Sequence, residues 1–90
     1  MLGTPAYMSP EQVDGKPLDG RADLYSIGIV LYEMLSGHLP YRGESMLSLG
    51  LKHMTMDIPY LPNTVKVFQP IINKLLAKQP QQRFHGYFTT

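Results

Sequence analysis

The sequence of 90 residues contains no cysteine, and its charges are few and balanced. Without cysteine the chain can form neither a disulfide nor a thiolate metal site, which suits a reducing compartment, so we expect a cytoplasmic protein. Eight basic residues oppose seven acidic residues, which leaves a net charge of +1. Because nucleic-acid binding usually needs a clustered basic face, we expect no nucleic-acid partner.

Long hydrophobic runs are also missing. The most apolar segment, residues 27–35, is interrupted by Tyr32 and Glu33, and it is far shorter than the roughly 20 residues that cross a bilayer. The first ten residues lack the basic stretch and apolar core of a secretory signal. We therefore expect no membrane partner. The length allows one small domain and is too short for a large enzyme with two lobes.

A metal site is not expected either. The three histidines, His38, His53 and His85, are dispersed along the chain. No two of them have the spacing of metal ligands on one helix. Each is more simply explained as an ordinary core or surface residue.

Eight prolines and eight glycines divide the chain into short blocks. Ser9 is placed to cap a short helix, with Pro10 at the first helical position and Gln12 able to reach back to the cap. The strongest helix pattern covers residues 20–37, starting at Asp19 or Gly20 and ending at Gly37. The isoleucines and valine there also suit a strand, but the length and the capping residues favour a helix.

This central helix is apolar around most of its circumference, which is typical of a buried helix. An amphipathic helix is predicted at residues 44–56, where Leu47, Leu51 and Met54 have helical spacing. A distal helix is predicted at residues 65–78, with Pro70 in or near its first turn. Its apolar stripe consists of Ile71, Ile72, Leu75 and Leu76. We predict an all-α fold of short helices around one buried central helix, joined by long loops.

Four motifs in this order carry a family resemblance. Residues 3–11 read GTPAYMSPE, which is similar to the substrate-docking loop and Ala-Pro-Glu end of the activation segment in bacterial-type serine/threonine protein kinases. Residues 23–37, DLYSIGIVLYEMLSG, resemble the central helix of the kinase C-terminal lobe. Residues 40–43, PYRG, match the turn after it, and residues 75–84, LLAKQPQQRF, resemble a distal block of that lobe. The resemblance implies that residues 1–90 form part of this lobe, with residues 1–12 as the docking loop and Ser-Pro-Glu motif.

The chain departs from the family pattern at Ser9, where alanine is usual, and at Gln79, where an acidic residue is usual. It also contains no glycine-rich loop, no Val-Ala-Ile-Lys strand, no His-Arg-Asp loop and no Asp-Phe-Gly motif. These parts bind ATP, hold magnesium and orient the attacking hydroxyl in kinases. The resemblance therefore implies ATP and Mg for the parent kinase and no cofactor, no metal and no catalytic residue for this chain.

The resemblance also implies roles for individual residues. Thr4 would be a supporting hydroxyl beside the catalytic aspartate and lysine of the parent. Gly3, Pro5 and Tyr7 would shape the substrate-binding surface with it. The alternative for Thr4 is a solvated loop residue.

Three charged residues are assigned structural roles. The resemblance implies that Glu11 and Arg83 form a buried pair, a role that suits arginine because its planar fork meets a carboxylate with two parallel hydrogen bonds; the alternative is two independent surface charges. Asp23 would anchor the catalytic loop in the parent. In this chain we expect it to act as a first-turn acid favoured by the helix dipole.

Two functions remain open. The first is a fragment of a Ser/Thr protein kinase that supplies substrate docking and scaffold and is inactive alone, with a protein substrate or the missing part of the domain as partner. The second is a kinase-derived helical protein-interaction module without catalysis. Its apolar helix surface exceeds what a short chain can cover, so it would expose a patch and self-associate.

Overall fold

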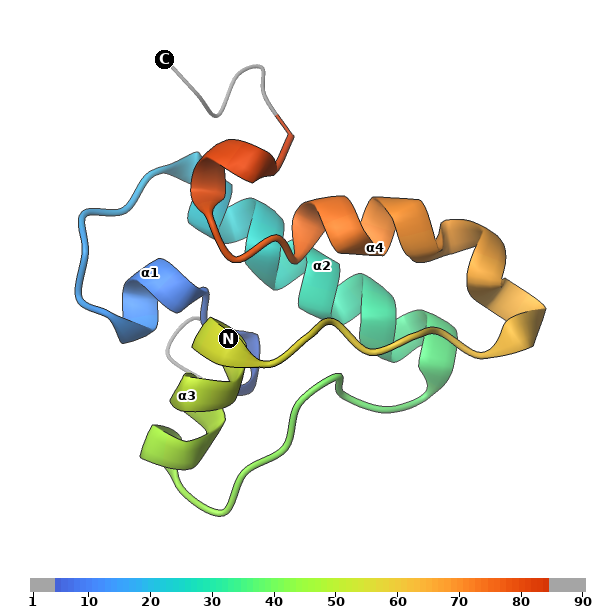
Figure 1. Ribbon diagram of the computed structural model, residues 1–90, viewed down its shortest axis with the longest axis horizontal. Helices are drawn as coiled ribbons and strands as arrows, with labels where there is room; N and C mark the ends of the chain where they lie inside the picture. The colour runs from blue at the N-terminus through green and yellow to red at the C-terminus, as the bar shows by residue number, and fades with distance from the viewer. Residues whose placement is uncertain (1–4, 85–90) are drawn as a thin grey trace.

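The computed structural model describes residues 5–84. The elements in order are η1 (Pro5–Tyr7), α1 (Pro10–Val13), α2 (Gly20–Ser36), α3 (Met46–Thr55), η2 (Asn63–Phe68), α4 (Gln69–Leu75) and η3 (Pro80–Gln82), where η marks a 3-10 helix. Helix α2 runs through the centre, with α4 alongside it and the α1 and α3 pair on its other side (Figure 1). No strand occurs within residues 5–84, so the predicted all-α architecture is confirmed.

Local chemistry sets the ends of the first two helices. The Ser9 side chain accepts a hydrogen bond from the backbone N–H of Gln12, and the Gln12 side-chain oxygen accepts one from the backbone N–H of Ser9, which completes a capping box. Asp19 caps α2 through the N–H of Arg21, and Gly37 ends α2 at a φ of 84°, a left-handed conformation that glycine adopts without strain.

The core forms where α4 packs on α2. It consists of buried residues from α2, α4 and the segment between α3 and η2: Tyr25, Ile29, Tyr32, Leu61, Ile72 and Leu76. The two helices approach closely at Gly28, where an added Cβ would lie 2.7 Å from the Cβ of Leu75. A side chain at position 28 would therefore overlap α4.

The prediction that α2 is buried on every side is correct for one face only. Its other face carries an exposed stripe of Ile27, Val30 and Met34, with Met34 76% exposed. These positions follow helical spacing, and α4 and η1 pack on other parts of the helix. We call these three residues the α2 stripe.

The predicted apolar face of α3 is wrong. Leu47 is 73% exposed and Leu51 is also exposed, whereas Leu49, Gly50 and His53 are buried. The reason is steric, because Gly50 lets α3 approach α1 until an added Cβ would lie 2.8 Å from Val13. With Gly50 facing α1, Leu49 is buried and Leu47 and Leu51 point outward.

The distal segment differs from the single helix predicted over residues 65–78. The structure has the 3-10 helix η2 first, with a non-helical backbone at Val65, and then α4. Pro70 lies in the first turn of α4, where its missing N–H costs nothing. Of the predicted stripe, Ile72, Leu75 and Leu76 are buried and Ile71 is exposed.

Candidate functional site

The turn at Pro5–Tyr7, which we call the docking segment, is held by hydrogen bonds to α2. The Tyr7 hydroxyl donates to a carboxylate oxygen of Glu33 at 2.7 Å, and the Ser26 hydroxyl donates to the backbone carbonyl of Tyr7 at 2.7 Å. The hydrogen bond to Glu33 raises the pKa of Tyr7, because the phenol is held as a donor. Of the residues predicted for substrate binding, Pro5 and Tyr7 thus lie on a fixed turn, while Gly3 and Thr4 lie outside the described residues.

An apolar pocket opens beside the docking segment, between α1 and α3. It has a volume of about 230 Å³. Its lining includes Pro5, Met8, Val13, Met46, Leu47 and Gly50. Met46 and Leu47 are exposed at its rim. A pocket of this composition suits one apolar side chain of a bound peptide.

Glu11 and Arg83 meet in a buried ion pair that joins α1 to the segment after η3. The Arg83 Nη1 and Nη2 atoms donate to the two carboxylate oxygens at 2.6 Å and 2.9 Å. The remaining N–H groups donate to the backbone carbonyls of Ala77, Arg21 and Lys78. Because every guanidinium donor has an acceptor, the desolvation cost of burying this cation is offset as far as hydrogen bonding allows.

The carboxyl group of Glu11 responds to two opposing effects. Burial acts to raise its pKa, but the hydrogen bonds and charge of Arg83 outweigh it, so the pKa of Glu11 lies below its ordinary value. The pair is therefore fully charged at neutral pH.

Asp23 is exposed in the first turn of α2. The helix dipole favours an acid there.

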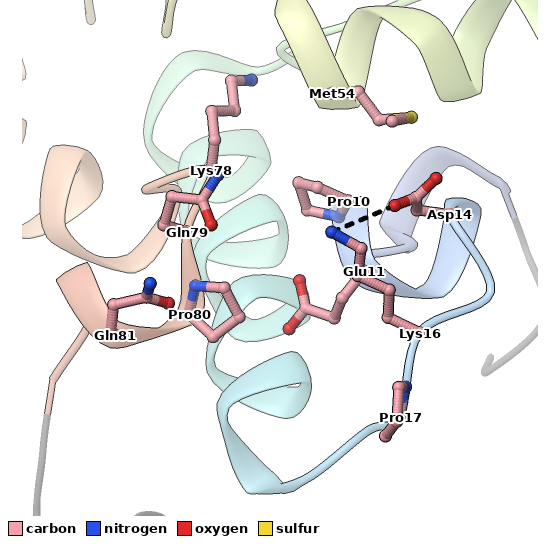
Figure 2. Close-up of a pocket in the computed structure, with 10 residues that line it drawn as sticks. All are labelled: Pro10, Glu11, Asp14, Lys16, Pro17, Met54, Lys78, Gln79, Pro80 and Gln81. Atoms are coloured by element: carbon pink, nitrogen blue, oxygen red, sulfur yellow. Dashed lines mark ion pairs between the residues drawn. The ribbon is translucent and has the colours of Figure 1, made fainter.

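A second pocket, of about 320 Å³, lies between α1 and η3 (Figure 2). Its charged groups are already paired within the chain: Asp14 with Lys16 at 3.3 Å, and Glu11 with Arg83. Lys78 donates to the Tyr41 hydroxyl at 2.9 Å, and burial lowers the pKa of Lys78 to about 8. The pocket therefore presents the amide groups of Gln79 and Gln81 together with charges that are already paired.

ATP and Mg, which kinase chemistry requires, do not fit the residues described. Within residues 5–84 no three His, Asp or Glu side chains lie together as metal ligands could. The pocket between α1 and α3 is lined mainly by apolar side chains, and in the pocket of Figure 2 Glu11 and Asp14 are paired with Arg83 and Lys16. We therefore derive no nucleotide chemistry from this chain.

Sequence reasoning missed Ser26 and Glu33, the two α2 side chains that hold the docking segment. A signal for them was present. They are polar residues seven positions apart within the largely apolar run of residues 24–35, and that spacing places both on one face.

Among residues 5–84 no helix is long and apolar enough to cross a membrane.

Comparison with known proteins agrees with this arrangement. The protein kinase domain family matches residues 1–86. The chain is 38% identical over 88 residues to the serine/threonine-protein kinase PknL of Mycobacterium tuberculosis, covering 93% of this chain and 22% of that protein. It is 40% identical over 93 aligned positions to PrkC of Bacillus subtilis, covering 99% of this chain and 14% of that protein.

A probable serine/threonine-protein kinase of Clostridium acetobutylicum is 42% identical over 91 aligned positions, covering 96% of this chain and 14% of the relative. The chain thus spans between 14% and 22% of the length of these three relatives. With its helical architecture, the match over nearly its whole length shows that the chain belongs to the protein kinase domain family.

Proposed function

We propose that this chain supplies the substrate-docking surface and part of the scaffold of a serine/threonine protein kinase domain, and that it transfers no phosphate alone. The single observation that carries the proposal is the docking segment, fixed by Ser26 and Glu33 beside an apolar pocket. A preformed turn next to a pocket lowers the ordering cost of binding a peptide. Its relatives are named serine/threonine-protein kinases, so the peptide would carry serine or threonine.

The division of labour follows from the chemistry of the family. In the parent kinase, Mg-ATP supplies the phosphoryl group that passes to the substrate hydroxyl. The residues of this chain would bind and orient the substrate chain. Thr4 would add a hydroxyl next to the acceptor. The partners of this chain would be the protein substrate and the remainder of the kinase domain.

Titration of the labelled 90-residue protein with short peptides tests the proposal by nuclear magnetic resonance. A peptide with an apolar residue next to its threonine is expected to shift the amide signals of Met8 and Gly50, and an aspartate in place of the apolar residue is expected to abolish the shifts. L47D is expected to weaken binding at least tenfold, because burial of a leucine side chain is worth about 1.5–3 kcal/mol. With Mg-ATP added, we expect no phosphopeptide.

The matched control is L51D. Leu51 is exposed on the same helix as Leu47 but does not line the pocket. Binding should stay within about twofold of the original affinity. Equal loss in both variants, or transfer of phosphate to the peptide, would contradict the proposal.

The α2 stripe favours a second candidate, a helical interaction module that binds a copy of itself. Ile27, Val30 and Met34 form an exposed apolar row on the longest helix, and such rows mark interaction surfaces. Light scattering after size exclusion is expected to show a dimer that M34E converts to monomer. V67E changes a residue of nearly equal exposure on η2 and should leave the mass unchanged. A monomeric original chain would count against this candidate.

A further inference from the structure

His53 is a buried polar residue that the proposed roles have not used. It lies on α3 with no exposed surface. The rings of Tyr25 and Tyr41 contact it edge to face, with centroids 5.7 Å and 5.2 Å away. An imidazole held this tightly has its orientation set by its neighbours.

The two ring nitrogens of His53 have different surroundings. Nδ1 lies 2.9 Å from the Tyr25 hydroxyl. Nε2 is buried without a hydrogen bond to any described residue. Helix α3 packs against η1, and the backbone groups of Pro5 and Ala6 in η1 act on the ring from that side. Those backbone groups favour a proton on the ring, as carbonyl oxygens do.

This arrangement selects one tautomer. If the Tyr25 hydroxyl donates to Nδ1, the proton of the neutral ring lies on Nε2 and faces the carbonyl side of the docking segment. The opposite tautomer would direct a bare lone pair of Nε2 at carbonyl oxygens, with no donor between them. The first tautomer satisfies more of the buried groups.

Burial keeps His53 neutral at pH 7. Burial lowers the pKa of His53 to about 4, and the positive charge of Lys78 acts in the same direction. The groups facing it from α2 and from the segment after α2 are the phenols of Tyr25 and Tyr41, and burial raises the pKa of both. The guanidinium of Arg83 lies over the ring of Tyr25, 4.9 Å from the ring centroid.

We propose that His53 is a positioning residue for the docking segment, with its Nε2–H directed at the backbone of Pro5 and Ala6 while the Tyr25 hydroxyl fixes the ring. Together with Ser26 and Glu33 it would hold the segment from two helices. The functional part of this inference rests on the proposed docking role. The geometric part concerns only the conformation of the segment.

The tautomer can be measured in the unaltered protein. Long-range proton–nitrogen correlation spectra at pH 7 are expected to show Nδ1 as the unprotonated nitrogen of His53 and Nε2 as the protonated one. The ring should remain neutral at pH 5, since its pKa is about 4. A neutral ring with its proton on Nδ1 would overturn the proposal without any substitution.

Two amide variants separate positioning from packing. In H53Q the amide nitrogen occupies the place of Nε2 and keeps a donor toward the docking segment. In H53N the side chain reaches only the place of Nδ1 and serves Tyr25 alone. The reporter is hydrogen exchange of the Met8 amide, which donates to the carbonyl of Pro5.

H53N is expected to accelerate Met8 exchange about tenfold, the effect of losing one hydrogen bond, while H53Q stays within about twofold. The control is the Leu76 amide of α4, bonded to the Ile72 carbonyl. Exchange that rises equally at Met8 and Leu76, or equally in the two variants, would overturn the positioning role.

The peptide titration distinguishes this inference from the docking proposal. If the peptide does not bind but H53N still exposes Met8, docking is contradicted and positioning stands. If the peptide binds and H53N leaves Met8 exchange unchanged, docking stands and the role of His53 is overturned. If the docking proposal and the positioning role of His53 are both correct, H53N should weaken peptide binding more than H53Q.

Discussion

R83M is expected to lower the free energy of unfolding by about 3–5 kcal/mol, because it leaves the buried Glu11 carboxylate without its partner. The same change leaves the carbonyls that accept from Arg83 without those donors. Urea unfolding followed by circular dichroism at pH 7 measures the loss. A domain of this size has a stability in the range of about 5–15 kcal/mol, so the variant should be close to unfolding at room temperature.

The double variant E11Q/R83M should regain part of the loss, since it removes the unpaired charge. K16A provides the surface control. The Lys16–Asp14 pair is exposed, so this change should cost less than about 1 kcal/mol. A loss in R83M no larger than that in K16A would show that the buried pair contributes nothing.

The pH dependence of R83M should differ in sign from that of the original protein. The pKa of Glu11 in the folded state lies below its ordinary value, so the pair's contribution is complete above the unfolded pKa and is lost as pH falls through the folded one. In R83M the charge and hydrogen bonds of Arg83 are gone, so burial, the largest effect on Glu11, is opposed only by hydrogen bonds from the backbone and Ser9, and we expect it to raise the pKa of Glu11. Mild acid should therefore stabilise R83M relative to pH 7.

I72A is expected to lower the free energy of unfolding by about 2–5 kcal/mol, the range for truncating a fully buried isoleucine. Ile72 has no exposed surface and packs in the core between α2 and α4. Its neighbour Ile71 is 43% exposed, so I71A removes the same atoms from the same helix at a much smaller cost. Thermal unfolding of both variants provides the measurement, and equal shifts in melting temperature would contradict the packing of α4 described above.

The ends of helices could be predicted from sequence where capping residues act locally. Ser9, Asp19 and Gly37 take part in hydrogen bonds or backbone conformations that involve only nearby residues. The buried face of α3 could not be predicted in this way. Its orientation depends on Gly50 meeting Val13 on another helix. The spacing of apolar residues within α3 does not predict that contact.

The residues of the candidate site also differ in whether the sequence could predict them. The resemblance of two motifs pointed to Glu11 and Arg83, which lie 72 positions apart and are in contact. Ser26 and Glu33, which hold the docking segment, also lie within a matched motif, but the resemblance assigned them no role. His53 in particular looks like any dispersed histidine until the fold encloses it between two tyrosine rings.

The contact between Glu11 and Arg83 also has a kinetic consequence. It closes a loop of 72 residues, and the entropic cost of closure grows with loop length. We expect such a contact to form late, after helices α2 and α4 have already paired, and to be absent from the folding transition state. Its energy should therefore slow unfolding and leave the folding rate nearly unchanged, so the ion pair sets the lifetime of the native chain more than the speed at which it is reached.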